Sequence, residues 1–346
     1  MHAGELQSAI VAMIGDESQT GHDLEQLRIF YNQAADEDAL KSIGLSQVQP
    51  YLDRVDALAS IEDLNALITD KDFPFMPFVQ STICTVGMQD KNVVKVEANL
   101  LFTDVELFGG QYYQDSDDEQ TKQSNQAELL SNAIPLVTDL MAQGMSEEEA
   151  KSFAKHVLAT ETKYGKHVDY DARYSSLPYG AFAQASFDSV CTYDELIALF
   201  TNLPMEGMLD KLGKLGSERY KVTREWAQAL NDLWTNENLE DLKSVVKATV
   251  LTETMPYRDQ SGINEARVSL GAPPTDASQS AYEACDNLNT LSQVIAKLYV
   301  NNAIGQEGKA RLEQLTHDLL DAYKELFEKT ACPRGTSSLE DTCRGA

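Results

Sequence analysis

The chain has 346 residues, of which 42% are hydrophobic and 24% are charged, a composition typical of globular proteins that bury an apolar core. Its charge is unbalanced, with 55 acidic against 28 basic residues and a formal net charge of −27. Such a surface repels phosphate backbones and anionic membranes. The sequence therefore disfavours nucleic acid as a partner, and the charge is expected to serve solubility.

No run of about 18 apolar residues occurs, so no membrane-spanning segment is predicted. The opening residues, MHAGELQSAIVAMIGDESQ, lack the basic region and apolar core of a secretory signal. The five cysteines are widely spaced and odd in number, unlike a disulfide framework: Cys84, Cys191, Cys285, Cys332 and Cys343. For the chain as given, a reducing, cytoplasmic location is the simplest expectation.

The first quarter of the chain shows helical periodicity. Helices are predicted over residues 23–32, 48–58 and 61–68. Ser60 with Asp63 resembles a capping box that starts the third helix. Between residues 78 and 102 the pattern changes to β-prone, nearly alternating residues, which are Val93, Val94, Val96, Ala98, Leu100 and Phe102. This pattern predicts a small β-hairpin.

Helical patterns return after Asp118. One helix is expected across Leu130–Met141, bent at Pro135 and closed by Gly144. Capping boxes are predicted at Ser146 with Glu149 and at Thr192 with Glu195. Further helices are expected over 226–234, 239–250 and, as a pair divided by Gly305, over 289–328. Residues 257–280 are interpreted as a loop with a short helix, and residues 331–346 as an unstructured tail. The predicted fold is therefore mainly α, a multi-helix domain over residues 1–330.

Catalytic motifs are not found. A zinc peptidase motif needs two histidines one helical turn apart with a glutamate between them. The histidines are His2, His22, His156, His167 and His317, and no pair has this spacing. Glu161 lies between His156 and His167, but eleven residues separate the two histidines. No Cys-x-x-Cys pair and no Gly-x-Ser-x-Gly elbow occur.

The sequence also lacks complete phosphate-binding and calcium-binding motifs. In Gly207–Lys214 the spacing has one residue too many for a P-loop, and Leu215 replaces the metal-binding hydroxyl, so a helix is favoured. The acidic run from Asp115 to Glu119 lacks the glycine and the bidentate acid of a calcium loop, where Gln120 and Gln126 stand instead. Carboxylate pairs stay open among 55 acids, but none stands out. No catalytic, cofactor-binding or metal-binding residue is assigned.

Several segments, in order along the chain, resemble the N-terminal, non-catalytic domain of the neprilysin and endothelin-converting-enzyme family of zinc metalloendopeptidases. The similar segments are Phe30-Tyr31, Ile43-Gly44-Leu45, Gln111-Tyr112-Tyr113-Gln114-Asp115, Glu161 with the helix before it, Asn238–Lys243, Ala284-Cys285 and Lys297-Leu298-Tyr299-Val300. Tyr282 stands where the family usually has an arginine-tryptophan pair. The family's opening Asn-Gly-x-Trp region and its catalytic His-Glu-x-x-His half are absent, which suggests a truncated coding sequence.

The resemblance implies a domain that covers a zinc-containing catalytic half and limits its chamber to short peptides. Its implied partners are that missing catalytic half and, in the complete enzyme, peptides. The chain itself is expected to bind no zinc and to be inactive alone. Family members include cytoplasmic and surface-anchored or secreted proteins, so the resemblance does not decide the compartment. The alternative is a free-standing α-helical module that binds peptides or proteins.

Overall fold

The computed structural model describes residues 3–86, 96–102, 107–114, 116–168, 190–213 and 220–330. The chain forms two compact units. We call residues 34–281 the central unit, and residues 1–33 with 282–346 the terminal unit. Residues 331–346, the predicted tail, lie outside the described residues.

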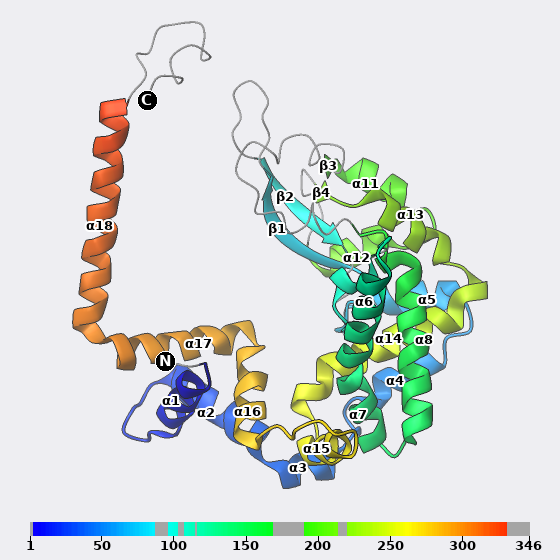
Figure 1. The fold of residues 1–346 in the computed structure, drawn as a ribbon, viewed down its shortest axis with the longest axis horizontal. Helices are drawn as coiled ribbons and strands as arrows, with labels where there is room; N and C mark the ends of the chain where they lie inside the picture. Colours follow the sequence, from blue (N-terminus) through cyan, green and yellow to red (C-terminus); the bar gives the residue numbers. More distant parts are fainter. Residues whose placement is uncertain are drawn as a thin grey trace, which may run out of the picture. The chain divides into compact units, whose positions relative to one another are not determined.

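Helices dominate the central unit (Figure 1). They are α3 (Glu37–Ile43), α4 (Gln49–Asp56), α5 (Ile61–Thr69), α6 (Glu119–Asn132), α7 (Ile134–Ala142), α8 (Glu147–Gly165), α11 (Tyr193–Leu199), α12 (Met205–Lys211), α13 (Arg224–Leu233), α14 (Leu239–Thr254) and α15 (Gln260–Ser269). Three single-turn 3₁₀ helices join them, η2 (Gly110–Tyr113), η3 (Asn236–Asn238) and η4 (Met255–Tyr257). The predicted mainly α fold is confirmed.

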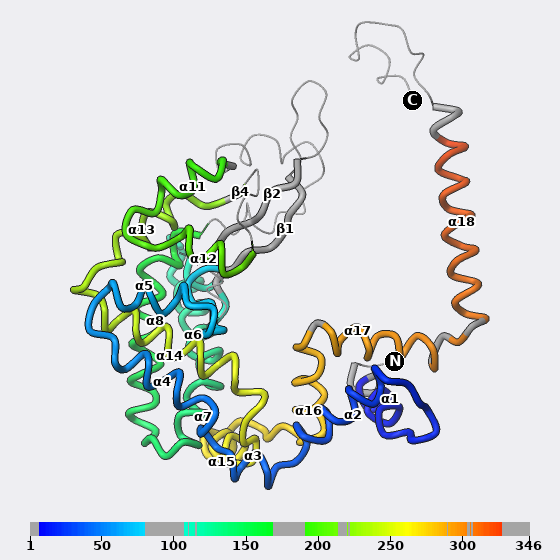
Figure 2. Tube along the Cα trace, turned by 180° about the vertical axis from the view of Figure 1, so that it is seen from behind, coloured from blue at the N-terminus to red at the C-terminus, as the bar shows by residue number. Residues whose placement is uncertain are grey.

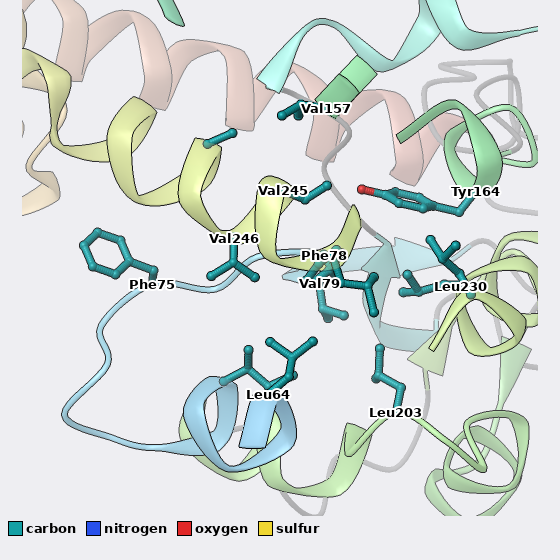
Figure 3. Packing of buried hydrophobic residues seen from close by; sticks show 14 of the residues in the cluster. Leu64, Phe75, Phe78, Val79, Val157, Tyr164, Leu203, Leu230, Val245 and Val246 are labelled. Carbon is teal, nitrogen blue, oxygen red and sulfur yellow. The ribbon is translucent and has the colours of Figure 1, made fainter. Parts of the chain in front are cut away.

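Helix α14 lies at the centre of this unit and contacts α4, α7 and α8. It buries side chains on every face, because the apolar residues of Leu239–Leu251 are not confined to one stripe. In Figure 3, Val245 and Val246 of α14 point toward the segment that carries Phe78 and Val79. The apolar core of the unit is built around this contact.

Phe78 adopts φ 73°, in the left-handed region where a bulky residue is strained. Its ring makes edge-to-face contacts with Trp234 and Tyr164, at centroid distances of 5.0 and 6.3 Å. The Trp234 indole in turn donates a hydrogen bond to Asn65 Oδ1 at 2.7 Å. The aromatic packing thus holds an unfavourable backbone conformation in place.

The predicted hairpin is present. Strand β1 (Gln80–Val86) pairs antiparallel with β2 (Val96–Phe102), with Gln80 opposite Phe102. Two very short strands extend it, β3 (Val190–Cys191) and β4 (Tyr220–Lys221), in the order β1-β2-β4-β3. Strand β4 runs parallel to β2 and antiparallel to β3. Two-residue strands are too short to leave a periodic signal in the sequence.

The terminal unit contains α1 (Ala3–Gly15), α2 (His22–Ala35), α16 (Ala277–Asp286), α17 (Asn289–Tyr299), a π-helical turn η5 (Val300–Ile304) and α18 (Gly305–Thr330). It has its own small core, made of Ile10, Ile14, Leu24, Leu27, Cys285, Ile295 and Leu298. Arg28 donates hydrogen bonds to the carbonyl oxygens of Ile14 at 2.6 Å, Gln19 at 2.8 Å and Asp16. This guanidinium therefore closes the C-terminal end of α1.

The capping motifs predicted from the sequence lie at the observed starts of three helices. In the Ser146 box, the Glu149 N–H donates to Ser146 Oγ at 3.3 Å, and the Ser146 N–H donates to Glu149 Oε2 at 3.1 Å. The Thr192 box is also complete. Ser60 accepts from the Asp63 N–H at 3.2 Å. These contacts confirm the starts of α8, α11 and α5.

One local expectation was wrong, and another was incomplete. The helix expected across Leu130–Met141 is divided into α6 and α7 at Ala133, because Pro135 sits in the first turn of α7, where its missing N–H costs no hydrogen bond. Residues 257–280 are more helical than expected, since they include α15 and the start of α16. Asp259 caps α15 by accepting from the N–H groups of Ser261 and Gly262.

Replacing Ser146 by alanine removes the acceptor of the capping box. We expect Ser146→Ala to lower the free energy of unfolding by about 1 kcal/mol, measured by urea denaturation followed by circular dichroism. Ser152→Ala is the matched control, because Ser152 is exposed within the same helix. It should change stability by less than about 0.5 kcal/mol. Equal losses in the two variants would contradict the capping role.

Candidate functional site

Glu161 of α8 is a buried acidic residue, with 1% of its surface exposed. Tyr113, at the end of η2, donates a hydrogen bond from its hydroxyl to Glu161 Oε2 at 2.5 Å. Both residues belong to segments that carry the family resemblance. The sequence did not indicate that they pair, because 48 residues separate them.

Burial raises the pKa of Glu161 to about 8, and the Tyr113 hydrogen bond opposes this rise without cancelling it. Burial and the nearby Glu161 carboxyl also raise the pKa of Tyr164 well above its usual value. A carboxylic acid that is neutral near pH 7 has the proton of a general acid. Because Glu161 is sealed from solvent, however, the arrangement serves structure, joining η2 to α8.

A second buried polar pair joins α7 to the segment after α14. Arg258 Nη1 and Nη2 donate to the two carboxylate oxygens of Asp139 at 2.6 and 2.7 Å. Arg258 Nη2 also donates to the Leu251 carbonyl oxygen at 2.7 Å. Both partners are almost fully buried. This two-pronged contact satisfies both charges inside the core.

Lys211, the last residue of α12, holds the end of α5. Its Nζ donates to the carbonyl oxygens of Ile68 at 3.0 Å and Phe75 at 2.9 Å, and lies 5.3 Å from the Phe73 ring centroid. Burial lowers the pKa of Lys211 to about 8, although Asp70 and Glu253 oppose that shift. The two carbonyl acceptors give this ammonium a structural role.

The histidines that the sequence analysis considered and rejected as zinc ligands lie apart from one another in the described residues. His156 Nε2 lies 3.3 Å from Asp241 Oδ1, and Lys163 donates to the other oxygen of the same carboxylate at 2.5 Å. His167 lies beyond the end of α8, and His317 is exposed on α18. Within the described residues, no three His, Cys, Asp or Glu side chains are placed to hold a metal ion. The donor groups described here therefore do not fit a catalytic zinc ion.

The rejected phosphate and calcium motifs have local structural roles. Gly207 lies inside α12, while Lys214 is outside the described residues. Asp118 caps α6 by accepting from the Thr121 N–H at 2.8 Å. Asp115 is also outside the described residues.

Helix α18 exposes several large apolar side chains. Figures 1 and 2 show it leading away from α1, α2 and α17. Six large side chains, between 51% and 58% exposed, define what we call the apolar face of α18: Leu312, Leu315, Leu319, Leu320, Tyr323 and Leu326. Charged residues interrupt this helix, and no helix in the described ranges is both long and apolar enough to cross a membrane.

The described residues form a multi-helix domain, and a comparison with known families shows where it belongs. Residues 3–332 match the N-terminal-domain model of peptidase family M13. The chain therefore belongs to peptidase family M13, which confirms the neprilysin-like resemblance. In this family, the N-terminal domain belongs together with a catalytic domain.

Relatives are about twice as long. A putative zinc metalloproteinase of Streptococcus gordonii is 24% identical over 319 residues, which are 87% of this chain and 52% of that protein. The fold is similar to the zinc metalloprotease Zmp1 of Mycobacterium tuberculosis, with TM-score 0.64, 18% identity, and coverage of 92% and 48% of the two chains. It is also similar to PepO of Lactobacillus rhamnosis, with TM-score 0.67, 13% identity, and coverage of 94% and 50%. The chain thus spans about half the length of these proteins.

The raised pKa of Glu161 makes stability depend on pH. Between pH 4.5 and about 8 the folded protein keeps a proton that the unfolded chain loses. The stabilisation by the neutral acid is therefore complete below pH 4.5, falls as pH rises, and levels off above about 8. Glu161→Gln should remove this fall, so its stability relative to wild type should rise by up to about 1.4 kcal/mol per pH unit.

The measurement is urea denaturation of wild type and Glu161→Gln at pH 5.5, 6.5, 7.5 and 8.5. Glu148→Gln, an exposed change on the same helix, is the control and should follow wild type. A constant difference between wild type and Glu161→Gln across this range would show that Glu161 is ionised in the fold.

Proposed function

We propose that this chain is the covering half of an M13 zinc metalloendopeptidase, which lies over a catalytic half and restricts it to short peptides. Family membership over residues 3–332 supports this role, as does the match to about half of each longer relative. In this proposal residues 1–330 form the covering half, and residues 331–346 are a tail outside it.

The apolar face of α18 is the observation that carries the proposal. Six large apolar side chains at helical spacing are more than half exposed, and an apolar face of this kind marks an interaction surface. The occupant that fits is the catalytic half, because the relatives are about twice as long as the part that this chain matches. Burying these side chains would contribute about 25 cal/mol for each Å² of apolar surface removed from water.

The chain alone is proposed to be inactive as a peptidase. Zinc-catalysed hydrolysis needs three protein ligands and an open position where water is activated. The sequence has no histidine pair one turn apart, and the described residues form no metal-binding group. In the complete enzyme, zinc and its ligands would come from the catalytic half.

The inactivity is tested on the purified chain. We expect less than about 0.1 zinc per chain by elemental analysis and no chelator-sensitive cleavage of a mixed fluorogenic peptide library. A separately purified M13 peptidase is the positive control. Zinc at one ion per chain, together with cleavage that a chelator stops, would show that the chain carries its own catalytic centre.

The covering role is tested with the separately expressed catalytic half of the Streptococcus gordonii relative. We expect a one-to-one complex by light scattering, and we expect Leu319→Glu to weaken it at least tenfold, because the change places a charge in an apolar contact. Ala310→Glu is the matched control, since it adds the same charge to an exposed position of α18 outside the apolar face. Failure of wild type to form the complex would contradict the covering role, and equal binding by Leu319→Glu would contradict the assigned face.

A further inference from the structure

The central unit has an open hollow of about 590 Å³ at the turn between α7 and α8. Its wall combines three short segments, the turn after α3, the end of α7 and the start of α8. The lining residues are Leu45, Leu140, Gln143, Gly144, Met145, Glu149 and Phe153. Its volume lies within the range of about 300–1,000 Å³ that is usual for small-ligand sites.

Gln143 lines this hollow, and its side-chain amide carries a donor without an acceptor. Its Nε2 atom is buried and, in the described part of the chain, makes no hydrogen bond. A buried amide N–H without a partner destabilises the folded state, because it has lost its hydrogen bond to water. An acceptor brought by a ligand would relieve this cost after a small rotation of the side chain.

Glu149 gives the hollow a negative charge. Its Oε2 accepts from the Ser146 N–H at 3.1 Å, and hydrogen bonds from Ser146 hold the pKa of Glu149 below its usual value. Glu147 and Glu148 precede it in the first turn of α8. With the −27 charge of the whole chain, this arrangement attracts cationic ligands and repels acidic ones.

We propose that this hollow binds a large apolar residue of a short basic peptide, with the main-chain carbonyl of that residue accepting from Gln143 Nε2. The side chain of the peptide lies against Leu45, Leu140, Met145 and Phe153, and its basic flanks face Glu149. A peptide combines three groups in one ligand: an apolar side chain for the apolar wall, a carbonyl acceptor for Gln143 and a positive charge for Glu149. The site lies entirely in the central unit, and its peptide binding is independent of the proposed covering role.

The probe is the blocked peptide acetyl-Lys-Leu-Phe-Lys-amide, titrated into the full chain by calorimetry at 150 mM salt to screen general charge attraction. Acetyl-Lys-Ala-Ala-Lys-amide tests the apolar residue, and acetyl-Glu-Leu-Phe-Glu-amide tests the charge. We expect saturable binding of the first peptide and at least tenfold weaker binding of the other two. Absent binding of the first peptide, or equal binding of the alanine peptide, would overturn the proposal.

Two variants locate the site. Met145→Glu fills the hollow with charge at a residue that is already 37% exposed, while Ser152→Glu adds the same charge outside it. We expect the former to abolish binding and the latter to preserve it. Gln143→Leu keeps the side-chain size and removes the unpaired donor, so it should leave thermal stability equal or higher while weakening binding about 2- to 10-fold. Unchanged binding in Met145→Glu would overturn the site, and unchanged binding in Gln143→Leu would overturn the assigned donor.

Discussion

The central unit depends on the burial of α14. A helix surrounded by α4, α7 and α8 must be apolar on all sides or must bring a partner for each polar group that it buries. Lys243 shows the second solution. Its Nζ donates to the carbonyl oxygens of Asp56 and Leu58, each at 3.2 Å, and to Glu240 at 2.9 Å. Lys243, in the second turn of α14, thus binds the carbonyl oxygens at the end of α4.

Buried polar groups elsewhere in the central unit follow the same rule. Asp139 and Arg258 neutralise each other across two elements, and Lys211 satisfies two free carbonyl oxygens. Glu161 differs from these pairs, because burial raises its pKa and so favours the neutral acid over the charged carboxylate of an ion pair. Because these contacts join segments that are distant in sequence, we assign them a role in holding the fold together. Buried groups with shifted pKa values are also common in active sites.

The surfaces suited to binding are apolar, and they lie in different units. The apolar face of α18 belongs to the terminal unit, and the hollow between α7 and α8 belongs to the central unit. The first is a long helical face suited to another folded domain, while the second has the size of one or two side chains. Both surfaces fit the proposal that this domain contributes contacts to peptides and to a catalytic half, and that the catalytic half supplies the reacting groups.

Sequence alone determined the mainly α class, the helix starts at Ser60, Ser146 and Thr192, the hairpin and the family, since each depends on residues close together in the chain. It also showed that no histidine pair has the spacing of a zinc motif. Only the tertiary structure decided that Tyr113 meets Glu161, that Asp139 meets Arg258, and which faces stay uncovered. The physical reason is that the partners lie 48 and 119 residues apart in the sequence. The fold of the intervening chain brings them together, and such a pairing leaves no periodic pattern in the sequence.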